Sequence, residues 1–231
     1  MMPSEGEAAN LHEVHHVEVQ SLMIVQAHEL DAEQTYKLLT GVVVPRPIAW
    51  ITTQSAAGVL NLAPFSAFTF VSTKPPLLGV NIGRKAGVRK DTAVNILSER
   101  EFVVHIAHGP LVEPLHASAV EHPPEVSEVE LLQLQTAPSS HVRAPRLQAA
   151  PVAMECRLHS VTPYGDTGSE FFVGEVLCWH VRDGLLVQGK VDSFELDPLC
   201  RLGGPWYATL GQRLHQTPHA QTAKTVLTRD G

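Results

Sequence analysis

The chain lacks the features of membrane, secreted and nucleic-acid-binding proteins. No apolar run approaches the roughly 20 residues of a bilayer-spanning helix, and the first residues, MMPSEGEAAN, lack the basic and apolar regions of a secretory signal. Lysine and arginine number only 17 against 24 acidic residues, for a formal net charge of -7, whereas a nucleic-acid ligand requires a basic face. The sequence therefore predicts a cytoplasmic protein that binds neither membrane nor nucleic acid.

Cysteine is also scarce, and no common cofactor motif is present. The three cysteines, Cys156, Cys178 and Cys200, are too widely spaced for a disulfide framework or a CxxC motif, so we expect buried, unreactive thiols. No GxGxxG follows a first strand, which argues against a Rossmann dinucleotide site. Histidines 12, 15 and 16 lie close together, but no carboxylate or cysteine spacing completes a metal site. We therefore predict a solvated segment there and no bound metal.

The composition is that of an ordinary folded domain. Hydrophobic residues make up 44% of the chain and charged residues 18%, and 231 residues suffice to bury a core. The polar, weakly patterned ends predict an N-terminal extension over residues 1–30 and a flexible tail over 212–231. The region between them, 31–211, is predicted to form one domain.

The hydrophobic pattern predicts a mainly β protein with few, peripheral helices. We expect helices over 31–41 and 91–98 and another opening at Pro110, and we read 121–150 as a surface excursion. The Asp183-Gly184 pair is a strong hairpin signal. Strands are expected over 42–44, 48–53, 60–71, 77–82, 101–107, 152–164, 170–181 and 185–191. About eight short strands with tight turns predict a closed or nearly closed antiparallel barrel.

The sequence GRKAGVRKDT over 83–92 concentrates positive charge in an acidic protein. Arg84, Lys85, Arg89 and Lys90 precede the predicted start of a helix, where free amide hydrogens and the helix dipole favour a phosphate. A solvated basic loop is the alternative interpretation.

A second candidate region is NLAPFSAF over 61–68. Asn61 and Ser66 offer hydrogen bonds to a polar heterocycle, and Pro64 frees neighbouring backbone groups from sheet pairing. An edge strand with a bulge explains the same pattern equally well. In PRPIAWITT over 45–53, Thr52 and Thr53 offer hydroxyl groups, while a tryptophan such as Trp50 more often belongs to a core.

Five segments in this order resemble the flavin reductase family, the FMN-binding split β-barrels. They are YKLLTGVVVPRPIAWITT at 36–53, GVLNLAPFSAF at 58–68, RKDTAVNI at 89–96, EFVVHI at 101–106 and DPLCRLGGPWYA at 197–208. The resemblance covers about residues 35–210. The N-terminal 30 residues have no counterpart, and 121–150 is too loosely matched to transfer any role.

The resemblance also implies positions for the cofactor and for a partner subunit. It places Thr52, Thr53, Asn61, Ala63 and Ser66 beside the isoalloxazine, and Arg84, Lys90 and Thr92 at the phosphate. Further predicted cofactor-binding residues are Arg46, Trp50, Pro64 and Arg89. Similar proteins are homodimers with flavin near the interface, so Trp206 and Tyr207 are expected to close the site, from the same or the partner chain. His180 matches a position where similar proteins carry histidine, although a packed strand histidine explains it as well.

The implied activity is electron transfer from NADH or NADPH to FMN, and from reduced flavin to a monooxygenase or another electron-acceptor protein. No catalytic acid or nucleophile is predicted, because flavin carries the redox chemistry and positioning supplies most of the effect. Ser66 or a neighbouring amide is the candidate donor to the reactive ring nitrogen. Two alternatives stay open: a flavoredoxin-like protein that holds FMN as an electron carrier without efficient NAD(P)H turnover, and a flavin-free β-barrel interaction module.

Overall fold

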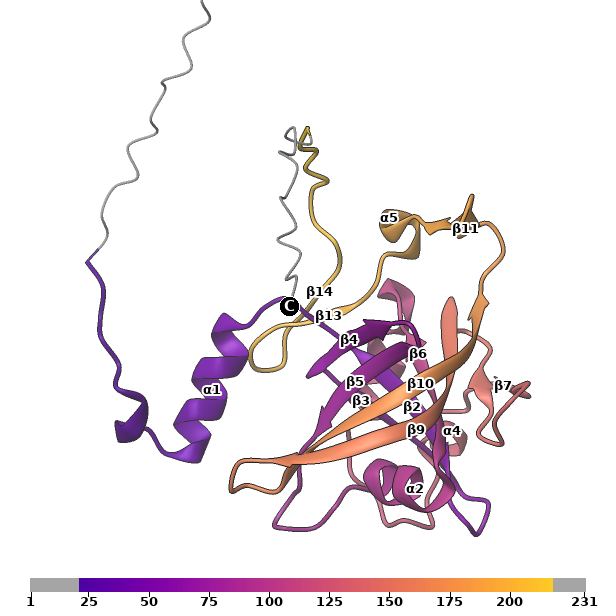
Figure 1. The fold of residues 1–231 in the computed structure, drawn as a ribbon, viewed down its shortest axis with the longest axis horizontal. Helices are drawn as coiled ribbons and strands as arrows, with labels where there is room; N and C mark the ends of the chain where they lie inside the picture. The colour runs from indigo at the N-terminus through magenta and orange to yellow at the C-terminus, as the bar shows by residue number, and fades with distance from the viewer. Residues whose placement is uncertain (1–20, 218–231) are drawn as a thin grey trace, which may run out of the picture.

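One seven-stranded antiparallel sheet dominates the computed structural model, which describes residues 21–217 (Figure 1). Its spatial order is β3-β2-β6-β9-β10-β5-β4. The strands are β2 (Ala49–Gln54), β3 (Leu60–Phe65), β4 (Phe68–Thr73), β5 (Pro76–Ile82), β6 (Glu101–Ile106), β9 (Val152–Tyr164) and β10 (Ser169–Val181). The predicted segment with histidines 12, 15 and 16, and residues 218–231 of the predicted tail, lie outside the described residues.

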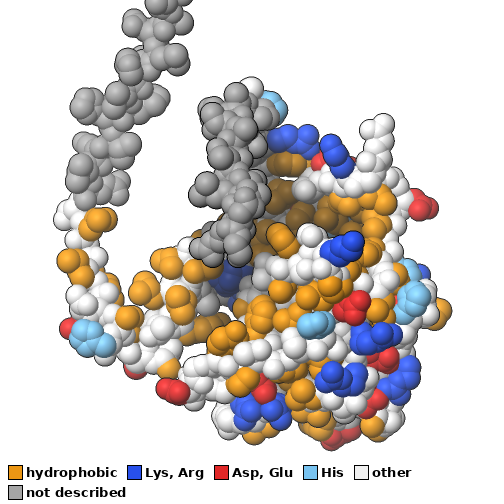
Figure 2. All heavy atoms as spheres, viewed as in Figure 1, with side chains coloured by type: hydrophobic (Ala, Val, Ile, Leu, Met, Phe, Trp, Pro, Cys, Tyr) orange, Lys and Arg blue, Asp and Glu red, His pale blue; other side chains and the backbone are white. Residues whose placement is uncertain are grey.

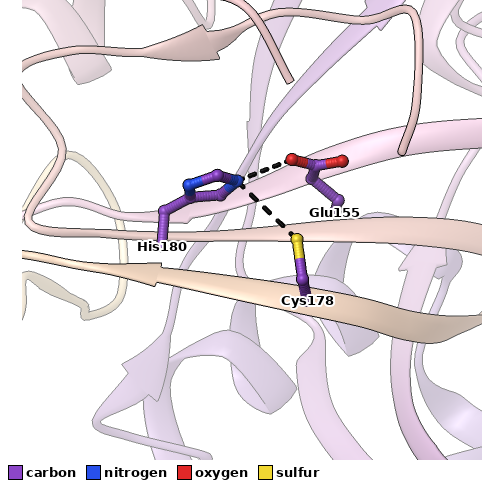
Figure 3. Close-up of side chains that lie close together, drawn as sticks. All are labelled: Glu155, Cys178 and His180. Carbon is purple, nitrogen blue, oxygen red and sulfur yellow. Dashed lines mark hydrogen bonds and ion pairs between the residues drawn. The ribbon is translucent and has the colours of Figure 1, made fainter. Parts of the chain in front are cut away.

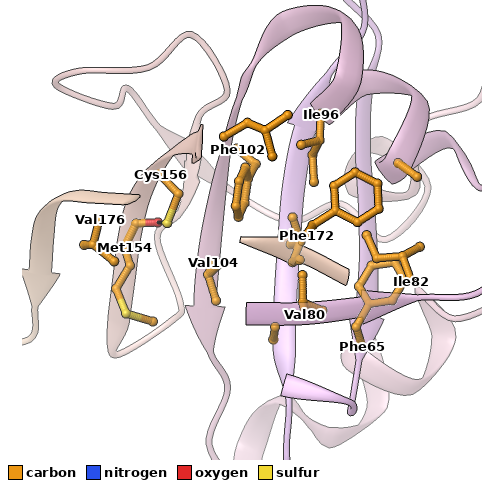
Figure 4. Close-up of a cluster of buried hydrophobic side chains, with 14 of the residues drawn as sticks. Phe65, Val80, Ile82, Ile96, Phe102, Val104, Met154, Cys156, Phe172 and Val176 are labelled. Atoms are coloured by element: carbon orange, nitrogen blue, oxygen red, sulfur yellow. Dashed lines mark hydrogen bonds between the residues drawn. The ribbon is translucent and has the colours of Figure 1, made fainter. Parts of the chain in front are cut away.

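The sheet curls so that its two edge strands, β3 and β4, follow each other in the chain. Only Ser66 and Ala67 separate them, and the Asn81 amide of β5 donates to Ala67 O at 2.8 Å. The enclosed core is apolar, and α2 (Asp91–Glu99) contributes the fully buried Ile96 to it (Figure 4). The barrel predicted from strand number and turn spacing is therefore confirmed.

Smaller elements surround the barrel. A three-stranded sheet contains β1 (Arg46–Pro47), β13 (Cys200–Arg201) and β14 (Tyr207–Ala208). Two hairpins pair β7 (Thr136–Ala137) with β8 (Arg146–Leu147), and β11 (Leu186–Val187) with β12 (Lys190–Val191). The other helices are η1 (Ala27–Glu29), α1 (Ala32–Val42), η2 (Gly109–Leu111), α3 (Val112–Ala117), α4 (Glu128–Leu131) and α5 (Ser193–Leu196). Between residues 21 and 217, no helix has the length and apolar character needed to span a bilayer.

Several predicted boundaries are corrected by the structure. The predicted 60–71 strand is two strands, β3 and β4. Residues 42–44 form no strand, because α1 continues through Gly41 to Val42. Asp183-Gly184 does not close a hairpin: the paired strands β11 and β12 flank Gln188 and Gly189, whose positive φ values of 51° and 75° suit a tight β-turn.

The 121–150 segment is not the surface excursion that its composition predicts. Val129 and Leu147 are buried against Ile48, Trp50 and Leu62 on the outer side of the barrel. His105 of β6 joins the two layers: its Nε2 accepts from Leu147 N at 2.9 Å, so Nδ1 carries the hydrogen and donates to Trp50 O. Burial lowers the pKa of His105 to about 4, which keeps this ring neutral.

Helix α1 stands apart from the barrel (Figure 1). Asp31 caps it as predicted, in a capping box with Gln34. None of its residues is buried, and Tyr36, Leu39 and Val42 are exposed. Figure 2 shows apolar side chains along α1 and the described residues that precede it. A helix of 11 residues is marginal in water unless its apolar face packs on something.

Candidate functional site

A cleft of about 460 Å³ opens between β3, the loop that precedes α2, and the segment after α3. Apolar side chains of the lining are Ala63, Pro64, Val88 and Val120, and charged residues of both signs from the loop, from α2 and from the segment after α3 complete it. The cleft therefore has an apolar wall and a charged part, and we call the part lined by Lys85 and Lys90, at the start of α2, the cationic end.

The two lysines of this cationic end approach one carboxylate. Lys85 Nζ lies 2.6 Å from Glu121 Oε2, and Lys90 Nζ lies 3.7 Å from Glu121 Oε1. A tight turn with positive φ at Ala86 and Gly87 brings the lysines to the same side. The hydrogen bond from Lys85 lowers the pKa of Glu121, so this carboxylate is ionised at neutral pH. An anionic ligand at this end would therefore have to displace the Glu121 carboxylate from the two lysines.

The start of α2 adds backbone donors to the cationic end. Lys90 is the N-cap residue, with extended backbone and no side-chain cap bond, in place of the predicted Asp91 cap. The first amide hydrogens of a helix have no partner inside the helix, and they carry its positive dipole end. Asp91 and Thr92 both line the cleft, so these amides lie at its edge.

Arg89 and Arg84 are bound by Glu170 of β10. Arg89 donates two hydrogen bonds to Glu170, with N···O distances of 2.8 and 2.7 Å, and Arg84 Nη2 lies 3.8 Å from the same carboxylate. Arg89 still lines the cleft, whereas Arg84 does not. Lys85 therefore takes the place at the cleft that the sequence assigned to Arg84.

Asn61 has a fixed orientation in the cleft wall. Its Oδ1 accepts from Thr92 Oγ1 at 2.7 Å and from Thr53 Oγ1 at 3.3 Å. Behind it, Asn95 Nδ2 donates to Thr53 Oγ1 at 3.0 Å. These contacts join β3, β2 and α2 by buried hydrogen bonds.

Glu128 completes this network from the 121–150 segment. Its Oε2 accepts from Asn61 Nδ2 at 3.0 Å and from Leu62 N at 2.9 Å. Glu128 is only 5% exposed, so both donors depend on it where water is largely excluded.

A second hollow of about 200 Å³ adjoins the cleft and shares Pro64 and Ala119 with it. Ser66 lines it, and Ser66 Oγ accepts from Arg46 Nε at 3.3 Å. Arg46 also donates to Thr40 O at 2.7 Å, so this arginine ties α1 to the barrel. Tyr207 also lines this hollow, and its hydroxyl accepts from Arg201 Nη1 at 2.7 Å.

The structure brings most of the predicted side chains to these two hollows. Those that line one or both are Arg46, Asn61, Ala63, Pro64, Ser66, Arg89, Lys90, Thr92 and Tyr207. Trp50, Thr52 and Thr53 are fully buried and line neither hollow, so the structure places them in the core rather than at the cleft surface. Trp50 Nε1 donates to Ser118 Oγ and Thr52 Oγ1 to Pro145 O, so neither donor faces the cleft. Trp206 is 69% exposed and lines neither hollow.

Sequence reasoning missed three charged residues of the site. Lys85 was within the basic cluster, but its spacing gave no reason to prefer it to Arg84. Glu121 and Glu128 belong to the 121–150 segment, whose composition indicated a surface loop. Only the fold brings these two carboxylates to β3 and α2.

Comparison with known proteins identifies the family. A model described as "Flavin reductase like domain" matches residues 41–195. The uncharacterised protein BH2278 of Halalkalibacterium halodurans is 40% identical over 195 residues, 82% of this chain and 93% of its own length. Nitrilotriacetate monooxygenase component B from Bacillus cereus has a TM-score of 0.83 and 36% identity, covering 86% of this chain and 100% of that structure.

The fold also matches a more distant structure, a split barrel domain protein from Shewanella frigidimarina. It has a TM-score of 0.73 and 22% identity and covers 84% of this chain and 96% of its own. At that identity the match supports the architecture alone. The family match over residues 41–195 shows that the chain belongs to the flavin reductase-like family, and the structural matches show that it has the split β-barrel fold.

Proposed function

We propose that this protein binds FMN in the cleft and transfers electrons from NADH or NADPH to the flavin, which then supplies a monooxygenase or another acceptor. The observation that carries the proposal is the convergence of Lys85 and Lys90 with the start of α2, at the end of a cleft with apolar walls. Cations and helix amides suit a phosphate dianion, and an apolar wall suits a flat heterocycle.

In this assignment each part of the site has a distinct task. Lys85, Lys90 and the first amides of α2 bind the phosphate after Glu121 turns away. Asn61 and Thr92 present polar groups of fixed orientation beside it, and Ala63 and Pro64 form the apolar wall. The flavin supplies the redox chemistry, since it accepts a hydride from a reduced nicotinamide. The described residues then need only bind, orient and exclude water.

The downstream acceptor is proposed from the comparison. A monooxygenase component with 36% identity and nearly full coverage supports a role in supplying reduced flavin to an oxygenase partner. The choice between an exchangeable and a permanently bound FMN defines the two candidate activities, reductase and flavoredoxin-like carrier.

An absorption spectrum of the purified protein, with and without added FMN, tests the proposed function. We expect flavin absorbance to follow the protein through gel filtration, and NADH or NADPH to be oxidised at about 1 s⁻¹ or faster with FMN present. A flavin-loaded protein that oxidises neither nicotinamide would identify the carrier. If FMN at high excess still elutes apart from the protein, the flavin assignment is wrong.

We also propose that the protein is a homodimer in which α1 packs on a second copy. The support is the exposure of Tyr36, Leu39 and Val42 on a helix without a buried residue. Tyr36 and Thr40 also line the second hollow, so a dimer contact through α1 would lie beside the site. Sedimentation velocity should give twice the 25.1 kDa chain mass. Leu39→Asp should shift the distribution toward monomer, whereas a monomeric parent protein would exclude the arrangement.

A further inference from the structure

Three potential metal ligands meet on the side of the barrel formed by β9 and β10 (Figure 3). Glu155 comes from β9, and Cys178 and His180 from β10. Their ligand atoms all lie within 4.8 Å of one another. The antiparallel register pairs Cys178 with Glu155 just after a β-bulge, and side chains two apart on a strand share a face. The pairing of β9 with β10 therefore brings together three potential ligands whose spacing in the sequence matches no metal-binding motif.

Glu155 is held in place before any ion arrives. It is 0% exposed, and its carboxylate accepts from Ser140 N at 2.7 Å, His141 N at 2.6 Å and Val142 N at 3.2 Å. Burial by itself would raise the pKa of Glu155, but hydrogen bonds from the Ser140 and His141 amides and from the His180 ring lower it to about 2. Carboxylates that bind a metal are usually hydrogen-bonded in turn, and the three backbone amides give Glu155 that support.

The His180 ring is the partly exposed member of the pair that it forms with the buried Glu155. Its Nε2 lies 2.6 Å from Glu155 Oε1 and 3.7 Å from Cys178 Sγ, and its side chain is 26% exposed. In tetrahedral zinc sites, neighbouring ligand atoms are about 3.3 to 3.7 Å apart. The sulfur–nitrogen distance fits already. The nitrogen–oxygen distance must widen by about 0.7 Å, which a small ring movement provides.

We propose that Glu155, Cys178 and His180 form a binding site for a divalent transition-metal ion of the Zn²⁺ class, which takes the place of the hydrogen between His180 and Glu155. Carboxylate, imidazole and thiolate together are a donor set that such ions prefer. On binding, the Cys178 thiol proton leaves to solvent and the imidazole hydrogen moves to Nδ1. One carboxylate and one thiolate then balance the charge of the ion.

A separate pocket of about 320 Å³ lies beside His180 and can supply the fourth ligand. Arg146 and Arg182 also line this pocket. Arg146 Nε is a buried donor with no hydrogen-bond partner among the described residues. A water molecule or a small anion in this pocket would complete a four-coordinate site.

Titration of the EDTA-treated, full-length protein with Co²⁺ tests this site, read as difference spectra against the same protein without metal. We expect one equivalent to produce the near-ultraviolet charge-transfer band of a cobalt–thiolate bond, with loss of about one proton per ion. The N-terminal histidines contain no sulfur and cannot give that band. Flavin content is equal in sample and reference, so the outcome does not depend on the proposed flavin function.

Cys178→Ser should abolish the cobalt–thiolate band and lower Zn²⁺ affinity at least tenfold by calorimetry. Cys200→Ser is the matched control, because Cys200 is also a partly buried free thiol but lies outside the set. It should keep both the band and the affinity. A parent protein without the band, or a band that survives Cys178→Ser, would overturn the proposal.

Discussion

Lys90→Ala should weaken FMN binding by about 1.5 to 3 kcal/mol, or roughly 10- to 150-fold in Kd, as expected for one lost charged hydrogen bond. Lys85→Ala should have a smaller effect, because the Lys85 side chain is 69% exposed and solvent screens its charge. The double variant should lose more than either single variant. Fluorescence titration of flavin against protein measures each affinity.

Two further variants separate specific contact from general electrostatics. Arg84→Ala removes a positive charge next to Lys85 in the sequence, but Arg84 faces Glu170 and does not line the cleft. We expect it to retain most of the affinity. Glu121→Gln should tighten FMN binding, because it removes the carboxylate that occupies both lysines. If Arg84→Ala weakens binding as much as Lys90→Ala, the phosphate has been assigned to the wrong side of the 83–92 loop.

Glu128→Ala should lower the free energy of unfolding by about 2 to 4 kcal/mol, because two buried donors lose their acceptor. These are Asn61 Nδ2 and Leu62 N. The freed Asn61 amide can also turn, so flavin affinity should fall together with stability. Urea denaturation and flavin titration of the same preparation measure the two effects.

Glu130→Ala is the matched control for this prediction. Glu130 has the same side chain and lies on the same short helix α4, but it is exposed. Exposed substitutions away from such networks usually change stability by less than about 0.5 kcal/mol. Equal unfolding midpoints for Glu128→Ala and the parent protein would show that the Asn61 network contributes nothing to the fold.

The split barrel and much of the site could be predicted from sequence where the signal is local. Alternating apolar residues separated by turns determine where strands form, because successive side chains of a strand face opposite sides. The 83–92 cluster and Asn61 were found for the same reason, since charge density and a polar interruption of a strand are visible in a short window.

Local patterns misled where packing decides the outcome. The resemblance predicts Trp50 and Thr52 as cofactor-binding residues, yet the 121–150 segment covers their face of β2 and makes a second core there. Thr53, on the opposite face, is buried and hydrogen-bonded to Asn61 and Asn95. Asp183-Gly184 carried the hairpin signal, but no strand pairs across it, and the turn at Gln188-Gly189 joins β11 to β12 instead.

The sequence alone determined the fold class, the family resemblance and a cationic loop before a helix, because each depends on neighbours along the chain. Only the tertiary structure decided that Lys85 rather than Arg84 faces the cleft, that Glu121 and Glu128 join it, and that Glu155 meets Cys178 and His180. These contacts depend on the register of β9 with β10 and on the path of the 121–150 segment. Composition and local pattern do not specify which distant side chains come together.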